Sequence, residues 1–264
     1  MIWRCRDFRI ELNRTRVMAI VNVTPDSFSD GGMYFRPEEA AARARNCLKE
    51  GADIIDLGGE STRPGATPIE WQEEWARLEA VLEILSGERR KCVISVDTYH
   101  EKTAARALKA GAAIINCVYK EHVPGMVALA RETGCGLVVP FRLEDIDSLK
   151  CFAGIEEQVL IDPMIGFGTT REEDMLLMGS IRRLAQIAPV LVGVSRKRLI
   201  KKLTGSKCIG RNLGGSVGAA VWCAMSGASV VRVHDVRETV QALAVANALA
   251  AMESPVDTRM EVQA

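Results

Sequence analysis

The sequence lacks several features that would point to a particular class of protein. Its 264 residues carry 34 Lys and Arg and 34 Asp and Glu, so the formal charge is zero. Nothing in that balance favours a polyanion such as nucleic acid as the main partner. The residues Met1–Arg6 lack the apolar core of a secretory signal. We find no internal repeat, linker or low-complexity segment, so a globular protein is the plain interpretation.

The eight cysteines lack any CxxC or other metal-ligand spacing. Buried free thiols in a reducing cytoplasm are therefore expected. Long uncharged runs are also scarce. Only Leu213–Val231 is nearly long enough to span a bilayer. That stretch contains several glycines and leads directly into Arg232, so we predict a buried helix followed by a buried strand, with no membrane contact.

Short apolar, β-branched runs recur along the chain and predict strands buried on both faces, as parallel strands are. These runs are Val17–Val21, Ile54–Leu57, Val93–Val96, Ala113–Ile115, Leu137–Val139, Val159–Ile161, Val190–Val194 and Val230–Val233. Helical stretches lie between them, and these are Pro37–Leu48, His100–Leu108, Val123–Glu132, Arg171–Ala188 and Val236–Met252.

Eight strands alternating with helices predict an α/β fold, a (β/α)8 TIM barrel that forms one domain over residues 1–264. A doubly wound sheet is the alternative, but no GxGxxG follows the first strand. Residues 2–12 are expected to form a short hairpin across the bottom of the barrel. Residues 253–264 are expected to be a polar tail.

Polar residues follow nearly every predicted strand, and the chemistry of a barrel of this kind lies at the carboxyl ends of its strands. Asp97, Asn116 and Asp162 offer carboxylates and an amide that can pair with a flat, donor-rich heterocycle. Lys197 offers a cation to a ring carbonyl or nitrogen. An Asp after a strand is often only a helix cap, but a packed core does not need several converging polar groups.

A second group of polar residues suits a phosphate. Arg63, Arg232 and His234 can bind phosphate oxygens, and Asn22 can hold a magnesium ion through its amide oxygen. The glycine-rich segments after the first, second and sixth strands can close over a substrate. Together these residues predict a polar heteroaromatic substrate that carries a phosphate group.

At these residues the chain resembles the dihydropteroate synthases, which belong to the pterin-binding enzyme family. The resemblance runs from about Val17 to Asn247 and is carried by long, specific blocks. The blocks are Met18–Gly32, Gly51–Gly65, Ile94–Thr98, Asp162–Gly168, Ser195–Lys197 and Arg232–Asp235.

The resemblance implies a barrel that joins 6-hydroxymethyl-7,8-dihydropterin diphosphate to p-aminobenzoate and releases pyrophosphate, with Mg²⁺, as a homodimer. The residues that it matches to pterin binding are Asp97, Asn116, Asp162, Lys197 and Arg232. Those that it matches to diphosphate binding are Asn22, Thr62, Arg63, Arg232 and His234, with Asn22 also at the metal. The p-aminobenzoate pocket would be bordered by Pro25, Pro64, Phe167 and Arg198. Catalysis would fall to Asp97, Asp162, Lys197 and Arg63.

The chain departs from the family pattern at several positions. Cys117 stands where an Asp usually follows the Asn, Pro140 stands at the usual Met, and Met164 replaces the Gly of Asp-Pro-Gly. Thr169 replaces a Lys, and Arg198 replaces a Ser that helps to bind the acceptor's carboxylate. An arginine there either pairs with that carboxylate or points to solvent.

The stretch between Asn116 and Asp162 is also shorter than the family pattern, so we expect the loop and helix after the fifth barrel strand to be reduced. Three functions remain open on the sequence: the ordinary synthase, a pterin-dependent transferase with another acceptor, and a non-catalytic pterin-binding protein. The retained diphosphate residues argue against the last.

Overall fold

Eight parallel strands form a ring at the centre of the molecule. In this computed structural model, residues 1–24, 36–60, 67–87, 92–205 and 212–252 are described. The strands are β3 (Arg16–Asn22), β4 (Ile54–Gly58), β5 (Val93–Asp97), β6 (Ile114–Asn116), β7 (Gly136–Pro140), β8 (Val159–Asp162), β9 (Leu191–Val192) and β10 (Val230–Val233). Their order is β8-β7-β6-β5-β4-β3-β10-β9, and a parallel bridge between Ile161 and Val190 joins the two ends. The predicted barrel is confirmed.

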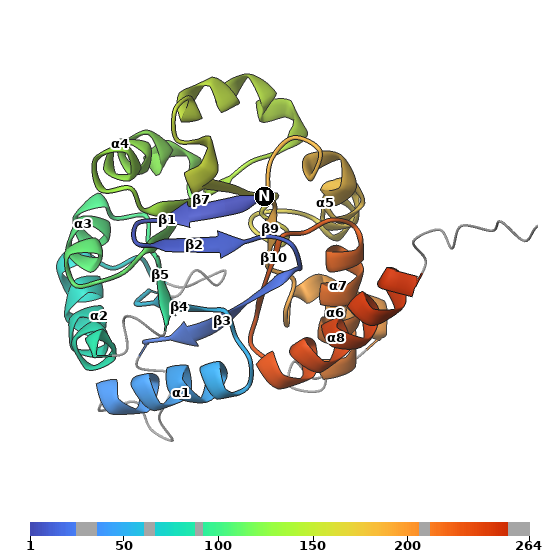
Figure 1. Cartoon of the computed structure of the whole chain (residues 1–264), viewed down its shortest axis with the longest axis horizontal. Helices are drawn as coiled ribbons and strands as arrows, with labels where there is room; N and C mark the ends of the chain where they lie inside the picture. The colour runs from blue at the N-terminus through green and yellow to red at the C-terminus, as the bar shows by residue number, and fades with distance from the viewer. Residues whose placement is uncertain (25–35, 61–66, 88–91, 206–211, 253–264) are drawn as a thin grey trace, which may run out of the picture.

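Helices surround this ring (Figure 1). They are α1 (Pro37–Lys49), α2 (Trp71–Ser86), α3 (Glu101–Lys109), α4 (Val123–Thr133), α5 (Arg171–Leu184), α6 (Arg198–Thr204), α7 (Leu213–Met225) and α8 (Val236–Met252). Local signals place their ends. Pro37 begins α1 with two acidic residues in its first turn. Thr170 and Glu173 form a capping box at the start of α5, which ends at Leu184 rather than at the predicted Ala188.

The connection after β7 differs from the other barrel units. Two 3-10 helices, η3 (Leu143–Phe152) and η4 (Glu156–Gln158), replace an α-helix there. Phe152 and Ile155 are buried and, together with Phe141 directly after β7, belong to the main apolar core. The shortened connection predicted from the sequence therefore still covers this side of the barrel with apolar side chains.

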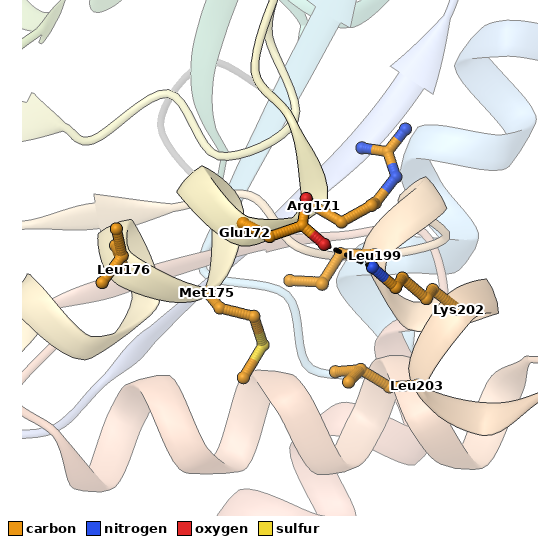
Figure 2. A pocket seen from close by; sticks show the side chains of 7 residues that line it. All are labelled: Arg171, Glu172, Met175, Leu176, Leu199, Lys202 and Leu203. Carbon is orange, nitrogen blue, oxygen red and sulfur yellow. Dashed lines mark hydrogen bonds and ion pairs between the residues drawn. The ribbon is translucent and has the colours of Figure 1, made fainter.

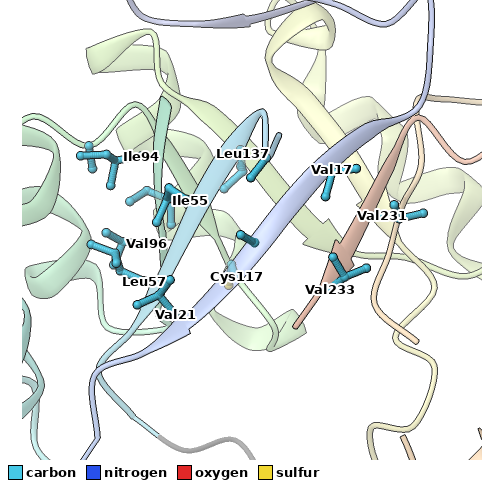
Figure 3. Close-up of a cluster of buried hydrophobic side chains, with 14 of the residues drawn as sticks. Val17, Val21, Ile55, Leu57, Ile94, Val96, Cys117, Leu137, Val231 and Val233 are labelled. Atoms are coloured by element: carbon cyan, nitrogen blue, oxygen red, sulfur yellow. The ribbon is translucent and has the colours of Figure 1, made fainter. Parts of the chain in front are cut away.

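Outward-facing strand residues form the core between the ring and its helices. Figure 3 shows this layer, in which residues two apart on one strand, such as Ile55 and Leu57 or Ile94 and Val96, share one face. Because side chains alternate along a strand, the residues between them face the barrel interior. The same alternation therefore sets both the core and the lining of the barrel.

A two-stranded antiparallel hairpin lies across the bottom of the barrel, as predicted. It consists of β1 (Ile2–Cys5) and β2 (Phe8–Glu11), drawn in blue in Figure 1. Trp3, Cys5 and Ile10 are buried against a second apolar cluster. The barrel residues of that cluster are Met18, Ile54, Ala113, Ile114, Val138, Leu160, Leu191 and Val230. The indole N–H of Trp3 donates to Gln158 O at 2.7 Å, which satisfies its polar atom.

The uncharged stretch Leu213–Val231 folds as helix α7 and then enters strand β10, as predicted. Among the described residues, none of the helices is both long and apolar enough to cross a membrane. The cysteines within the described ranges are free thiols, and all except Cys151 are buried. The proposed tail, 253–264, lies outside the described residues.

Candidate active site

The inside of the barrel changes from apolar to polar toward the carboxyl ends of its strands. On β4, Asp56 follows Ile54 by two residues and therefore shares its inward face. The register pairs Asp97 on β5 with Asn116 on β6. It also pairs Pro140 on β7 with Asp162 on β8. Strand alternation and register thus bring the predicted carboxylates and amide to one end of the barrel.

Arg232 on β10 lies at the centre of this polar end. Its Nε donates to Asp56 Oδ2 and its Nη2 donates to Asp97 Oδ2, both at 2.6 Å. Asn116 Nδ2 also donates to Asp56 Oδ2, at 3.3 Å. The Arg232 side chain is 15% exposed and that of Asp56 is fully buried. One guanidinium therefore holds two buried carboxylates in fixed positions, which charge-assisted bonds make rigid.

Two carboxylate oxygens of this network have no hydrogen-bond partner among the described residues. They are Asp56 Oδ1 and Asp97 Oδ1, and both are buried. Buried acceptors are normally satisfied, so these atoms indicate a place for donors from a ligand. Burial raises the pKa of Asp97 to about 7, although Arg232 acts in the opposite direction. A buried carboxylate with such a raised pKa is typical of a functional site.

Lys197 and Asp162 are a second pair of buried, oppositely charged groups that influence each other's pKa. Burial lowers the pKa of Lys197 to about 8, opposed by the negative charge of Asp162. Burial raises the pKa of Asp162, while the Lys197 ammonium and the Met164 N–H act against that rise. The Lys197 ammonium donates to Ile165 O and lies 3.9 Å from the centre of the Phe167 ring. This is cation–π geometry.

Met164 occupies an unusual backbone conformation next to this lysine. Its φ is +61°, in the left-handed region that favours glycine. Its backbone N–H donates to Asp162 Oδ1 at 2.7 Å, which fixes the direction of that carboxylate. A methionine in this turn therefore carries a steric cost that a glycine would not.

The remaining predicted residues lie near the rim or outside the described ranges. Asn22 ends β3, and a Cβ placed on Gly58 would come 3.7 Å from its Oδ1. His234 Nδ1 lies 3.1 Å from Ser195 Oγ. Arg198 is the first residue of α6 and is exposed. Four predicted residues, Pro25, Thr62, Arg63 and Pro64, lie outside the described residues.

Sequence reasoning missed Asp56. It stands within the run Ile54–Leu57, which we interpreted only as a strand and which the structure extends to Gly58. The available signal was the alternation of side chains along a strand. A carboxylate two residues from Ile54 must lie on the same inward face as Ile54. A fully buried Asp in that position needs a cation, and Arg232 supplies it.

An open apolar groove lies away from these residues, between α5 and α6 (Figure 2). Its lining residues are Arg171, Glu172, Met175, Leu176, Leu199, Lys202 and Leu203. The Lys202 ammonium bonds Glu172 Oε1 at 2.5 Å across it. None of the site residues predicted from the sequence lines this groove, so it does not belong to the polar end of the barrel.

The fold and the site define a class of protein: a parallel barrel with buried carboxylates and cations gathered at one end, an arrangement suited to a polar planar ligand. Comparison with known proteins agrees. A family model described as pterin binding enzyme matches residues 18–151 and 141–234. A dihydropteroate synthase of Neisseria meningitidis serogroup B is 39% identical, with 94% of this chain and 97% of that protein covered.

Solved structures give the same result. A dihydropteroate synthase of Xanthomonas albilineans with 4-aminobenzoic acid has a TM-score of 0.86 and 38% identity, covering 95% of this chain and 99% of that one. A second structure from that organism, in complex with 7,8-dihydropteroate, has a TM-score of 0.81 and 35% identity, covering 94% and 99%. This chain belongs to the dihydropteroate synthase family, transferases of folate biosynthesis.

Proposed function

We propose that this chain joins the amine of p-aminobenzoate to the exocyclic methylene of 6-hydroxymethyl-7,8-dihydropterin diphosphate. The carbon–oxygen bond to the diphosphate breaks, a carbon–nitrogen bond forms, and the amine loses a proton. The observation that supports this most directly is the pair of buried oxygens on Asp56 and Asp97, beside Arg232, that have no partner in the described part of the chain. Acceptors of this kind complement the N–H groups of a pterin ring.

Four residues around the ring would bind and polarise it. Asp97, Asn116 and Asp162 would face its N–H groups, and Lys197 would donate to a ring carbonyl or nitrogen. Arg232 would lie beneath the pterin site, because both of its described bonds already go to Asp56 and Asp97. We therefore assign Arg232 first to holding the Asp56 and Asp97 carboxylates in place for pterin, and only second to contact with the diphosphate. Asp162 would also stabilise positive charge on the ring as diphosphate departs.

The diphosphate would lie over the rim, where Asn22 and His234 end β3 and follow β10. Thr62 and Arg63 complete this set by resemblance. The amine needs positioning more than activation by a base, because an aryl amine is already neutral and nucleophilic at pH 7. Phe167, with Pro25 and Pro64, would border its pocket. An exposed Arg198 would meet the carboxylate of p-aminobenzoate only at the solvent edge of that pocket.

The residues present fit a magnesium ion that is shared with substrate. The strand end at Asn22 offers one amide oxygen over Gly58, a position without a side chain. Within the described ranges no cluster of three His, Cys, Asp or Glu residues forms a cage. Mg²⁺ commonly takes few protein ligands and completes its shell with phosphate and water. When bound, the ion would neutralise charge on the departing diphosphate.

The test is release of pyrophosphate by the purified protein with magnesium and the pterin diphosphate, with and without p-aminobenzoate. Release that requires p-aminobenzoate, with dihydropteroate as product, supports the proposal. Binding of the pterin diphosphate without that product would contradict it and would favour another amine or a binding role. Lys197→Met should remove turnover, whereas Lys201→Met, which changes an exposed lysine on α6, should not.

We also propose a homodimer in the cytoplasm. Large apolar side chains are exposed along α7 and α8, two helices that pack against each other. They are Trp222, Met225, Val245, Leu249 and Met252, with exposed fractions of 46%, 43%, 62%, 58% and 75%. Their spacing places each set on one helix face. Light scattering should give twice the chain mass, and Leu249→Glu should give the monomer.

The free thiols of the described residues support the second part of this proposal, a reducing compartment such as the cytoplasm.

A further inference from the structure

A single buried carboxylate connects helix α5 to the segment that follows β8, residues 163–169. Asp174 is fully buried and is the fourth residue of α5. Its Oδ1 accepts the backbone N–H of Gly166 at 2.6 Å and the hydroxyl of Thr169 at 2.5 Å. Its Oδ2 accepts from Arg171 at 3.0 Å. Sequence reasoning gave this residue no role, because acidic residues are common in the first turns of helices.

The segment held by Asp174 is in direct contact with Lys197. The Lys197 ammonium donates to Ile165 O, and the Phe167 ring lies 3.9 Å from it. The fit is close: a Cβ placed on Gly166 would come 2.6 Å from Lys197 Cδ. A shift of this segment by an ångström would therefore move the lysine and the aromatic ring together.

The backbone of this segment follows an irregular path. Met164, Gly166 and Gly168 have φ values of +61°, +79° and +65°, so left-handed residues alternate with others. Such a path forms no regular ladder of hydrogen bonds. The Phe167 N–H donates to Met164 O at 3.2 Å, and side chains add further bonds. Asp162 holds one end through the Met164 N–H at 2.7 Å, and Asp174 holds the other.

We propose that Asp174 is a positioning residue that holds Phe167 and Lys197 in place for the transferase reaction. This proposal rests on the proposed function. Thr169, which stands at the family's usual lysine position, takes part by donating its hydroxyl to Asp174. The negative charge of Asp174 also favours the charged form of Lys197. The other groups that act on this lysine are Asp162 on β8, Arg232 on β10 and Asp97 on β5.

Glu173 provides a matched control. It precedes Asp174 on α5, is exposed, and bonds Thr170 in the capping box rather than the segment beside Lys197. Loss of Glu173 weakens the start of the helix without touching Gly166 or Thr169. Effects shared by the two positions therefore come from helix stability, and effects confined to Asp174 come from its bonds to the segment.

The experiment compares Asp174→Asn, Asp174→Ala and Glu173→Ala in the full chain, by two readouts. The first is kcat/KM for both substrates. Asp174→Ala should lower it about tenfold, which is the loss expected for a buried bond to a charged group. Asp174→Asn should retain more activity, because its amide oxygen can still accept from Gly166. Glu173→Ala should stay within about twofold of the parent chain.

The second readout needs no turnover: the pKa of Lys197, followed by carbon NMR of the lysine side chains and assigned with Lys197→Arg. The pKa should fall in Asp174→Asn and stay unchanged in Glu173→Ala. Equal pKa values in the parent chain and Asp174→Asn, or equal losses of activity in Asp174→Ala and Glu173→Ala, would overturn the proposal. An inactive parent chain would instead refute the proposed function and leave the NMR comparison to decide on Asp174.

Discussion

The two ends of the barrel interior are built by the same strands, yet they have opposite chemistry. Two residues along a strand separate an apolar side chain at the bottom from a polar one at the top. Such pairs are Ile54 and Asp56 on β4, Ile114 and Asn116 on β6, and Leu160 and Asp162 on β8. The bottom is closed by Trp3 of the hairpin, whereas the top holds buried oxygens that no described residue contacts as a hydrogen-bond partner.

This difference shows how a charged site is accommodated in a folded domain. Each large apolar side chain buried at the bottom favours folding by about 1.5–3 kcal/mol. The charges at the top oppose folding unless each is paired, as Arg232 is with Asp56 and Asp97. Stability should therefore depend mainly on the bottom and chemistry on the top.

Arg232→Met should have the largest effect of these changes on kcat/KM, because it removes the cation that both Asp56 and Asp97 contact. We expect kcat/KM to fall by about a thousandfold, since the carboxylates lose their fixed positions. Unfolding free energy should fall by about 3 kcal/mol, which urea titration measures. The pKa of Asp97, already raised to about 7, should rise further. A group with a raised folded pKa loses stability as pH increases, so the deficit should be greater at pH 8 than at pH 6.

The double variant Arg232→Met with Asp56→Asn distinguishes the two effects. It removes one of the charges left without a partner, so part of the lost stability should return while activity stays lost. Recovery of activity would show that Arg232 is not needed to hold the carboxylates that bind pterin, and would contradict the assignment.

Trp3→Ala should be the matching change at the bottom. Trp3 is 1% exposed and bonds Gln158 O, so its loss leaves a cavity under the barrel. We expect about 3–5 kcal/mol of lost stability in urea unfolding. In protein that remains folded, kcat/KM should stay within about threefold of the parent value, because no atom of the polar end is touched. A loss of activity as large as that of Arg232→Met would remove the proposed division between the two ends.

The pH dependence of kcat/KM for the pterin diphosphate gives a smaller test of the top. Asp97 must be ionised to accept ring donors and Lys197 must be charged to donate. Activity should therefore fall below about pH 7 and above about pH 8, the pKa values that burial gives these groups. Lys197→Arg should remove the alkaline limb, because a guanidinium does not titrate in this range. An alkaline limb that persists in this variant would mean that another group causes it.

The sequence predicted the strands well because β-branched apolar runs are local features. Arg232 could be placed on the last strand, but not its bonds to Asp56 and Asp97, which come from β4 and β5. Asp174 could not be found at all, since its partners Gly166 and Thr169 become neighbours only when α5 folds back on the preceding turn. The 3-10 helices after β7 also escaped prediction, although a shortened connection was expected there.

Met164→Gly should have the smallest effect, and it tests whether the top of the barrel has given up stability without gaining function. A left-handed non-glycine residue costs about 1–2 kcal/mol of stability, which glycine would relieve. Glycine also gives the unfolded chain more conformational freedom, and this reduces the gain. Because φ at Met164 is +61°, we expect a net gain of up to about 1 kcal/mol in urea unfolding. The bond from its N–H to Asp162 should persist, so kcat/KM should change less than about twofold. Met164 is 7% exposed, so its side chain also packs, and Met164→Ala separates that packing from the backbone term. A loss of stability in the glycine variant, matched by the alanine variant, would mean that packing of the methionine outweighs the strain of the turn that carries it.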